Sequence, residues 1–489
     1  MSTELPNSSA YSPHEGLFDE MFARASEARA GCGMVVDELF GLSVAQLGEM
    51  RRQADAMFLR QGVTFNVYGN EEKTERIFPF DPIPRVIDAP TWAHLEAGLT
   101  QRVRALNAFI ADVYGDAEIL KDGIVPRDMV LSSPQYRYAA IGLKPPLGNF
   151  VTVAGIDLVR GEDGRFYVLE DNVRTPSGVS YVLENRVVMT RLMPRLIRAC
   201  GVRSVESYPA DLLASLSEIA PHGKSNPTIA LLTPGMFNSA FFEHVALAQL
   251  MGIDLVEGRD LVCVDHHLFM KTVRGLKQVD VVYRRIDDDF LDPVTFRPDS
   301  VLGVAGLAAA MRAGNVAVAN GIGTGVADDK GIFAYTPEMI RYYLAEEPIL
   351  PIVETHLLRN PDVRRMVLRD LDRYVVKPIG ESGGYGVVIG PKATYRELAR
   401  ARDQIEKDPK SFIAQPVIQL SVHPTVVGES GNGAGPIQPR HVDLRPFVLL
   451  GARPRVLPGG LTRVALREGS LIVNSSQGGG SKDTWVLEA

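Results

Sequence analysis

Apolar residues recur with a helical period in several long segments of the chain. Between residues 16 and 61 they return three and four positions apart, as on one face of a helix, and the same spacing appears over residues 91–114 and 180–199. Pro90 stands at the start of the second segment, where proline is common in helices. We therefore expect helices in these segments and a mostly helical N-terminal region over residues 1–125.

A strand-like pattern takes over after this region. β-branched and aromatic residues are concentrated in residues 153–159 and 166–172, and a polar turn containing glycine separates them. The two runs predict an antiparallel hairpin. We assign residues 126–225 to one unit built around it.

Short apolar runs alternate with a helical segment between residues 226 and 330. Strands are expected over 228–233, 253–257, 261–264 and 279–283, and a helix over 239–251. Alternation of this kind predicts a small parallel sheet with helices on its faces.

The remaining segment, residues 331–489, is again mixed. Strands are expected over 373–378, 387–389, 412–418 and 441–450, with a helix over 394–407 and a glycine-rich excursion over 421–439. The C-terminal stretch contains Trp485 and Val486, which favour an end that packs over a loose tail. The fold class is therefore α/β, in the mixed α+β sense.

Net charge, apolar stretches and cysteine spacing limit the classes of protein to which this chain can belong. The 489 residues carry a net charge of −7, which gives no general affinity for nucleic acid. No stretch of about 18 apolar residues suggests a membrane span. The three cysteines have no metal-type spacing, and residues 1–12 lack the apolar run of a signal peptide. We expect a cytoplasmic protein that binds neither nucleic acid nor membrane.

Oxygen-bearing side chains gather on the predicted hairpin. Glu170 and Asn172 lie two positions apart on one strand and therefore face the same side, whereas Asp171 faces the other side. Asp157 would lie within reach on the neighbouring strand. Such hard oxygen ligands suit Mg²⁺ shared with substrate phosphates. A single aspartate on a strand is more often a surface charge, so the metal interpretation depends on a partner motif.

That partner motif lies near residue 377. Lys377 ends a predicted strand and enters a glycine-rich loop. The loop's candidate phosphate-binding residues are Gly383, Gly384, Tyr385 and Gly386. Glycines let backbone N–H groups approach phosphate oxygens, and a lysine adds a point charge. The loop is not a P-loop, because a strand follows it and no Gly-Lys-Ser/Thr is present. Gln415, on the strand after the next helix, could line an adenine pocket.

Candidate substrate-binding arginines occur at strand ends. Arg284 and Arg285 precede three aspartates after a predicted strand, and ligands often bind at such ends. A carboxylate or phosphate site and an ion-paired surface turn explain this segment equally well. Arg445 and Arg463 lie on or beside later strands. The glycine-rich segment before Lys330 lacks dinucleotide-binding spacing and is interpreted as a loop leading to that lysine.

Taken together, the Asp157, Glu170 and Asn172 trio, Lys377 with its glycine loop, and the Gln415 strand resemble the ATP-grasp superfamily. The metal-ligand strands precede the lysine strand here, which reverses the usual order. The chain is therefore most similar to circularly permuted ATP-grasp proteins such as the synthetase domain of glutathionylspermidine synthetase. The resemblance implies a permuted ATP-grasp core, with residues 226–330 as a pre-ATP-grasp-like domain and residues 331–489 as the part with the lysine and the glycine loop.

The resemblance also implies cofactors and chemistry. ATP and Mg²⁺ would be bound, with the trio as metal ligands and Lys330 and Lys377 as the phosphate lysines. The implied enzyme is an ADP-forming carboxylate–amine ligase that makes an amide or peptide bond through an acyl phosphate. Arg284, Arg445 or Arg463 would stabilise that intermediate.

Some family properties do not carry over. No cysteine-peptidase domain is evident, and residues that recognise glutathione or spermidine cannot be matched. The substrates are therefore expected only as a small-molecule or peptide carboxylate and an amine, and the oligomeric state stays open. A non-catalytic nucleotide-binding scaffold or regulatory protein and an ATP-dependent phosphotransferase are the alternatives.

Overall fold

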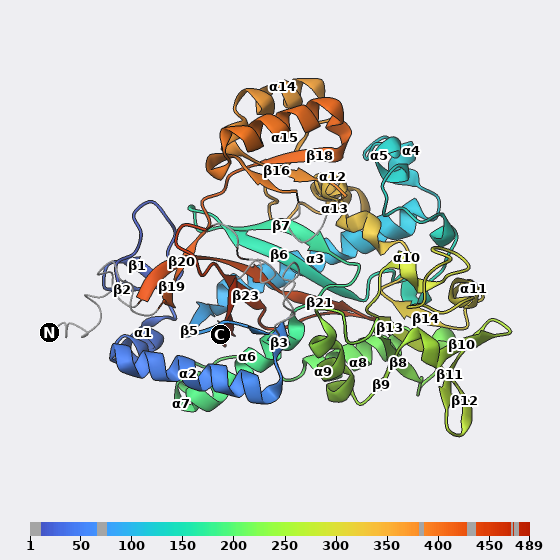
Figure 1. Cartoon of the computed structure of the whole chain (residues 1–489), viewed down its shortest axis with the longest axis horizontal. Helices are drawn as coiled ribbons and strands as arrows, with labels where there is room; N and C mark the ends of the chain where they lie inside the picture. The colour runs from blue at the N-terminus through green and yellow to red at the C-terminus, as the bar shows by residue number, and fades with distance from the viewer. Residues whose placement is uncertain (1–10, 66–75, 381–385, 428–436, 471–472, 474–478) are drawn as a thin grey trace.

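A nine-stranded sheet forms the centre of the molecule (Figure 1). The computed structural model describes residues 11–65, 76–380, 386–427, 437–470, 473 and 479–489. The main path of the sheet runs β22-β21-β6-β20-β23-β24-β5, with β7 added to β6 and β19 added to β20. Its strands are β5 (Phe80–Ile87), β6 (Val153–Arg160), β7 (Phe166–Asn172), β19 (Val422–Val426), β20 (Ile437–Arg445), β21 (Phe447–Leu450), β22 (Pro454–Val456), β23 (Leu461–Val464) and β24 (Gly480–Val486).

Helices cover both faces of this sheet. They include α1 (Gly33–Leu39), α2 (Val44–Gln61), α3 (Ala89–Val113), α6 (Val179–Leu192) and α7 (Pro194–Ala199). α3 places Trp92 and Phe109 in one hydrophobic core, whereas Phe58 of α2 and Trp485 of β24 lie in a second core. The Asp88 carboxylate accepts a hydrogen bond from the Thr91 N–H at the start of α3. The helix predicted over residues 91–114 is thereby confirmed.

Two segments that were predicted to be helical are interrupted in the structure. Within residues 16–61, a small hairpin of β1 (Phe22–Arg24) and β2 (Glu27–Ala28) precedes α1. The Asp19 carboxylate accepts hydrogen bonds from two backbone N–H groups at its start, and Ser26 adopts a φ of 65° in the turn. The segment 180–199 is divided between α6 and α7, because a proline at position 194 disfavours helical backbone at the residue before it.

A smaller parallel sheet follows, as predicted, and its strand order is β14-β13-β8-β9. Its elements are β8 (Ile229–Leu232), β9 (Asp254–Val256), β13 (Val281–Arg284) and β14 (Ala317–Ala319), with α8 (Tyr208–Glu218), α9 (Phe241–Met251), α10 (Asp288–Leu291) and α11 (Leu307–Arg312). The segment 261–264 does not join it. Asp265 and His266 have φ of 47° and 58°, as in a tight hairpin turn.

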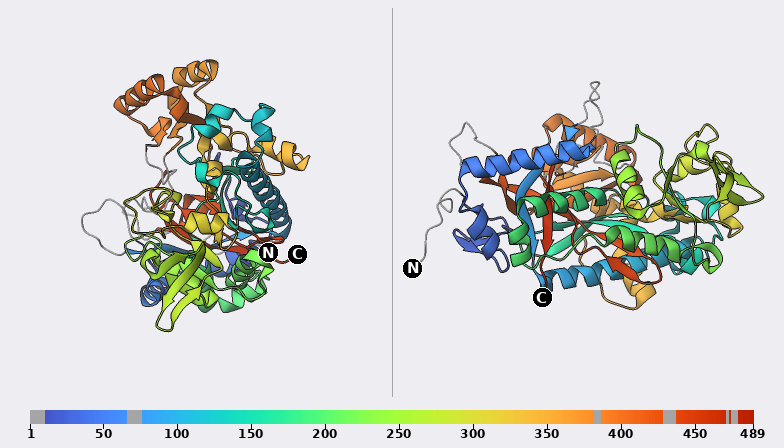
Figure 2. Two further views of the ribbon diagram at one scale, coloured as in Figure 1. Left: turned by 90° about the vertical axis from the view of Figure 1, so that its right-hand side faces the viewer. Right: turned by 90° about the horizontal axis from the view of Figure 1, so that it is seen from below.

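That turn starts a separate antiparallel sheet of β10 (Leu261–Val264), β11 (His267–Thr272) and β12 (Gly275–Gln278). Figure 2 shows it, in yellow-green, at the end of the molecule opposite the β1–β2 hairpin. It lies away from the predicted site, so His266 and His267 belong to a peripheral hairpin.

The lysine subdomain, residues 356–416, stands above β6 and β7 in Figure 1. It consists of β15 (His356–Leu357), β16 (Tyr374–Pro378), β17 (Val388–Ile389), β18 (Phe412–Pro416), α14 (Pro361–Arg369) and α15 (Tyr395–Lys407). It has its own hydrophobic core, which includes Val367, Val376 and Ile405. The short helices α12 (Lys330–Phe333) and α13 (Thr336–Leu344) precede it in the chain. The strand and helix predictions for this subdomain are confirmed.

The C-terminal segment is part of the central sheet. β24 is buried along its length and lies between β23 and β5, running parallel to β5. This confirms the prediction that the chain end packs. The excursion predicted over residues 421–439 is wrong at both ends, because β19 pairs with the beginning of β20 across five residue pairs. Residues 428–436 lie outside the described residues. Among the described residues, no helix combines the length and apolar content needed to cross a bilayer.

Candidate functional site

The β6–β7 hairpin has the predicted register. The two strands are antiparallel, Asp157 lies directly opposite Glu170, and Asn172 lies opposite Gly155. A bulge follows Asp157. The structure therefore brings the three predicted metal ligands onto one pair of strands.

Asp171, between two of these ligands, faces the other side of the sheet as predicted. Its two carboxylate oxygens accept hydrogen bonds from Arg102 of α3 at 2.6 and 2.7 Å, and both side chains are almost fully buried. The Arg102 guanidinium also lies over the Phe333 ring. This pair fixes α3 against the strand that carries Glu170.

Replacing Asp171 with alanine should therefore lower stability. The Arg102 charge would remain buried without its partner, a change that typically costs about 3–5 kcal/mol. Urea unfolding would measure this loss. Glu162→Ala, in the exposed turn of the same hairpin, should stay within about 0.5 kcal/mol of the parent protein. Equal midpoints for the two variants would contradict the assigned role of the pair.

Glu170 and Asn172 retain unused oxygen atoms. None of the described residues gives the Glu170 side chain a hydrogen bond or an ion pair, and it lines a cleft beneath β16. The buried Nδ2 of Asn172 likewise has no hydrogen-bond partner in the described part of the chain. The Glu170 carboxylate and the Asn172 side-chain oxygen are of the oxygen type that Mg²⁺ prefers, whereas the unpartnered Asn172 nitrogen is not a metal ligand.

Asp157 is held differently. Its carboxylate accepts hydrogen bonds from Nε and Nη2 of Arg445, the latter at 2.8 Å, and from Nη2 of Arg463 at 2.8 Å. Burial alone would raise the pKa of Asp157, but the two guanidiniums outweigh it and hold that pKa at about 2. Arg463 also pairs with Asp443. A carboxylate has about four acceptor positions, so Asp157 has room for one further bond.

The predicted phosphate lysines meet Glu170 across the cleft. Lys330, Lys377 and Gln415 line it together with Glu170. It leaves room for about 10 Å³, about the space of one water-sized sphere. Burial lowers the pKa of Lys377 to about 8, and Lys330 adds to that effect while Glu170 opposes it. The structure therefore shows a closed cleft with cationic and anionic walls.

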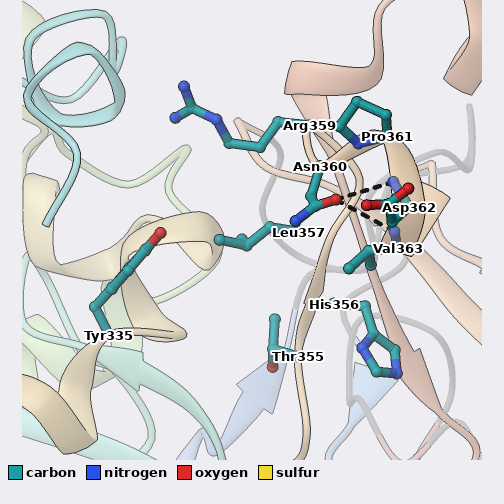
Figure 3. A pocket seen from close by; sticks show the side chains of 9 residues that line it. All are labelled: Tyr335, Thr355, His356, Leu357, Arg359, Asn360, Pro361, Asp362 and Val363. Atoms are coloured by element: carbon teal, nitrogen blue, oxygen red, sulfur yellow. Dashed lines mark hydrogen bonds between the residues drawn. The ribbon is translucent and has the colours of Figure 1, made fainter.

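Gln415 stands between this cleft and a larger cavity. Its Nε2 donates to Thr355 Oγ1 at 3.0 Å. Thr355 lines a cavity of about 630 Å³, shown in Figure 3, in which Tyr335 faces Leu357 and Arg359. Arg359 also pairs with Asp128, a residue of the helix α5 (Arg127–Leu131). This ion pair joins the lysine subdomain to the body of the molecule.

The glycine-rich loop can be followed only in part. Gly383, Gly384 and Tyr385 lie outside the described residues. Gly386 adopts a φ of 69°, and a Cβ there would lie 2.9 Å from Pro378 Cγ. Glycine at 386 thus allows the chain to turn back toward β17.

Arg284 is placed away from this chemistry. Its guanidinium donates to the backbone oxygens of Asn320, Ile286 and Gly321 at 2.7–3.0 Å and pairs with Asp288 at 2.7 Å. The side chain is fully buried. These contacts indicate that Arg284 stabilises the end of the small parallel sheet. They favour the ion-paired turn over the carboxylate or phosphate site, although the ion pair is buried and not on the surface.

Arg285 holds the loop that follows the metal-ligand strand. It donates to Pro176 O at 2.8 Å and Ser177 Oγ at 2.5 Å, and it pairs with Glu243 at 2.9 Å. Glu243 in turn accepts the Gly178 N–H at 2.7 Å. The small parallel sheet therefore fixes the segment between β7 and α6.

Sequence reasoning missed Asp328 as a residue of the cleft. One carboxylate oxygen accepts the Val173 N–H at 2.6 Å, and the residue lines the cleft with Glu170. Burial raises the pKa of Asp328 to about 7, although the Arg174 guanidinium opposes the rise. The sequence feature that could have identified Asp328 is its position two residues before the predicted phosphate lysine Lys330.

Comparisons with known proteins found similar sequences and solved structures. A sequence model of the family described as circularly permuted ATP-grasp type 2 matches residues 84–465. An uncharacterized protein of Synechocystis sp. is 51% identical over 473 residues, covering 96% of this chain and 97% of its own length. A Mycobacterium tuberculosis relative is also 51% identical, over 96% of this chain and 84% of its own length.

Another relative has a functional name. A provisionally named glutamate–cysteine ligase of Frankia casuarinae is 42% identical over 96% of this chain, which spans 53% of that protein. Among solved structures, a glutathione synthetase-like effector of Globodera pallida without ligand aligns with a TM-score of 0.57 and 12% identity. The alignment covers 91% of this chain and 98% of the effector. At that identity the likeness concerns the fold.

Proposed function

Because the chain belongs to the circularly permuted ATP-grasp type 2 family, we propose that it is an ATP- and Mg²⁺-dependent carboxylate–amine ligase. The product would be an amide or peptide bond, formed through an acyl phosphate. The main supporting observation is the unpaired Glu170 carboxylate, which faces Lys330 and Lys377 across one cleft.

The two sides of the cleft would bind different parts of Mg·ATP. Lys330 and Lys377 would hold the phosphates of ATP. Glu170, Asn172 and the remaining acceptor position of Asp157 would hold Mg²⁺, which supplies charge neutralisation and alignment for phosphoryl transfer.

The closed cleft implies a movement. A space of about 10 Å³ cannot admit the phosphates of ATP between Glu170 and Lys377, so the lysine subdomain would move away from β7 when they bind. Its separate hydrophobic core supports movement as one body. Reclosure would exclude water, which would otherwise hydrolyse the acyl phosphate.

The first acid to test comes from named relatives. Two Frankia proteins are provisionally named glutamate–cysteine ligases, and this chain spans 53% and 54% of their lengths. We therefore place L-glutamate first in a screen of amino acids and small peptides.

The proposal predicts equal amounts of ADP and inorganic phosphate. Purified protein with ATP, Mg²⁺, an acid from the screen and hydroxylamine as a small amine should release both products and form the matching hydroxamate. Mass spectrometry and a phosphate assay would measure them. A stable phosphorylated product would identify a phosphotransferase instead, and nucleotide binding without any turnover would favour the scaffold alternative.

A further inference from the structure

The arginines predicted to stabilise the acyl phosphate are already engaged. Arg284 is bonded to backbone carbonyls and Asp288, and Arg463 to two aspartates. Arg445 donates to Asp157 through Nε and Nη2 and to Ser177 O through Nη1 at 3.2 Å. An incoming anion would have to displace firm partners from each of them.

Arg174 differs in its contacts. It follows Asn172 by two positions, just beyond β7, and its side chain is 21% exposed. Among the described residues its one hydrogen bond joins Nη1 to Gln135 Oε1 at 3.2 Å. Nη1 also lies 3.4 Å from the Asp287 carboxylate, and Nε lies 3.6 Å from that of Asp328. Nε is buried and has no hydrogen-bond partner among the described residues. The two aspartates thus balance the charge of Arg174, while most of its N–H groups make no hydrogen bond to the described residues.

The backbone beside Arg174 is shaped to admit it. A Cβ on Gly325 would lie 2.8 Å from Gln135 Oε1 and 3.3 Å from Arg174 Cδ. Gly325 belongs to the 3₁₀ turn η6 (Thr324–Asp328), which ends two residues before Lys330. The glycine-rich segment before Lys330 therefore leaves space for the Arg174 side chain at Gly325.

Arg174 also borders the cleft. Asp328, its neighbour at 3.6 Å, lines the cleft together with Glu170 and Lys330. A guanidinium with unused donors next to a phosphate-transfer site is suited to two oxygens of one phosphate group.

We propose that Arg174 is the oxyanion-binding residue of this site, holding the phosphate group of the acyl phosphate and then the released phosphate ion. The proposal rests on the proposed function for the acyl phosphate. Nη2 would donate to phosphate oxygens, while Nε stays beside Asp328 and Nη1 beside Gln135 and Asp287.

Phosphate titration tests the site without knowledge of the acid. Inorganic phosphate is titrated calorimetrically into the full-length protein with and without Mg·ADP. The parent protein should bind phosphate, and Arg174→Gln should weaken that binding at least tenfold while Mg·ADP affinity changes less than threefold. Arg191→Gln, on the exposed face of α6, serves as the matched control. Equal phosphate affinity in the parent and Arg174→Gln proteins would overturn the proposal.

Turnover distinguishes bound acyl phosphate from free phosphate. Hydroxamate formation by Arg174→Gln should fall at least a hundredfold in kcat with little change in KM for ATP, and added methylguanidinium should restore part of it. If Arg174→Gln does not fold, Gly325→Ala displaces the guanidinium without removing its charge and should weaken phosphate binding as well. Unchanged phosphate binding in that variant would refute the site. Absence of ADP release by the parent protein would reject the ligase, while the phosphate titration would still decide the role of Arg174.

Discussion

Glu170→Gln is expected to reduce ATP turnover by at least about 10³-fold while the protein remains folded. The side chain makes no hydrogen bond or ion pair among the described residues, but its charge raises the pKa of the buried Lys377, so Glu170→Gln should also lower that pKa. A ligand to a phosphate-bound metal contributes several kcal/mol to the transition state, and each 1.36 kcal/mol corresponds to about tenfold in rate. Phosphate release in the presence of a productive acid and hydroxylamine measures the effect.

Two controls separate catalysis from folding. Glu162→Gln makes the same chemical change in the exposed turn of the same hairpin and should turn over at the parental rate. The urea midpoint of Glu170→Gln should fall less than that of Asp171→Ala, because Asp171 is hydrogen-bonded to Arg102 whereas Glu170 makes no hydrogen bond among the described residues. Parental phosphate release by Glu170→Gln would remove the metal role from this residue.

Local sequence rules predicted the hairpin well. A period of two residues placed Glu170 and Asn172 on one face and Asp171 on the other, and the turn length placed Asp157 on the opposing strand. These features depend on neighbours within about 15 positions, where strand geometry is decisive. Lys377 was found for the same reason, since a strand that enters a glycine-rich loop is a local signal.

Contacts between distant segments were beyond such rules. Asp157 is hydrogen-bonded to arginines 288 and 306 positions later, so sequence alone could not show how much of its carboxylate is used. Arg284 and Arg174 illustrate the same limit. Both follow strands and look alike in sequence, yet one is enclosed by carbonyl groups and the other keeps unused donors.

Lys377 should make ATP use depend on pH. Burial lowers its pKa to about 8, so the free protein loses the positive charge as the pH rises through that value. Since kcat/KM reports the free enzyme, kcat/KM for ATP should fall about tenfold per pH unit above about 8. Bound phosphates favour the charged lysine and raise its pKa, so kcat should stay flatter over the same range.

Lys377→Arg isolates this effect. Arginine stays protonated throughout the range, so the alkaline fall in kcat/KM should disappear, whatever the change in absolute rate. Lys407→Arg, on the exposed face of α15, should retain the parental profile. Steady-state rates between pH 6.5 and 9.5, at several ATP concentrations, provide both parameters. An alkaline fall that persists unchanged in Lys377→Arg would assign the titration to another group and weaken the case that this lysine holds the phosphates.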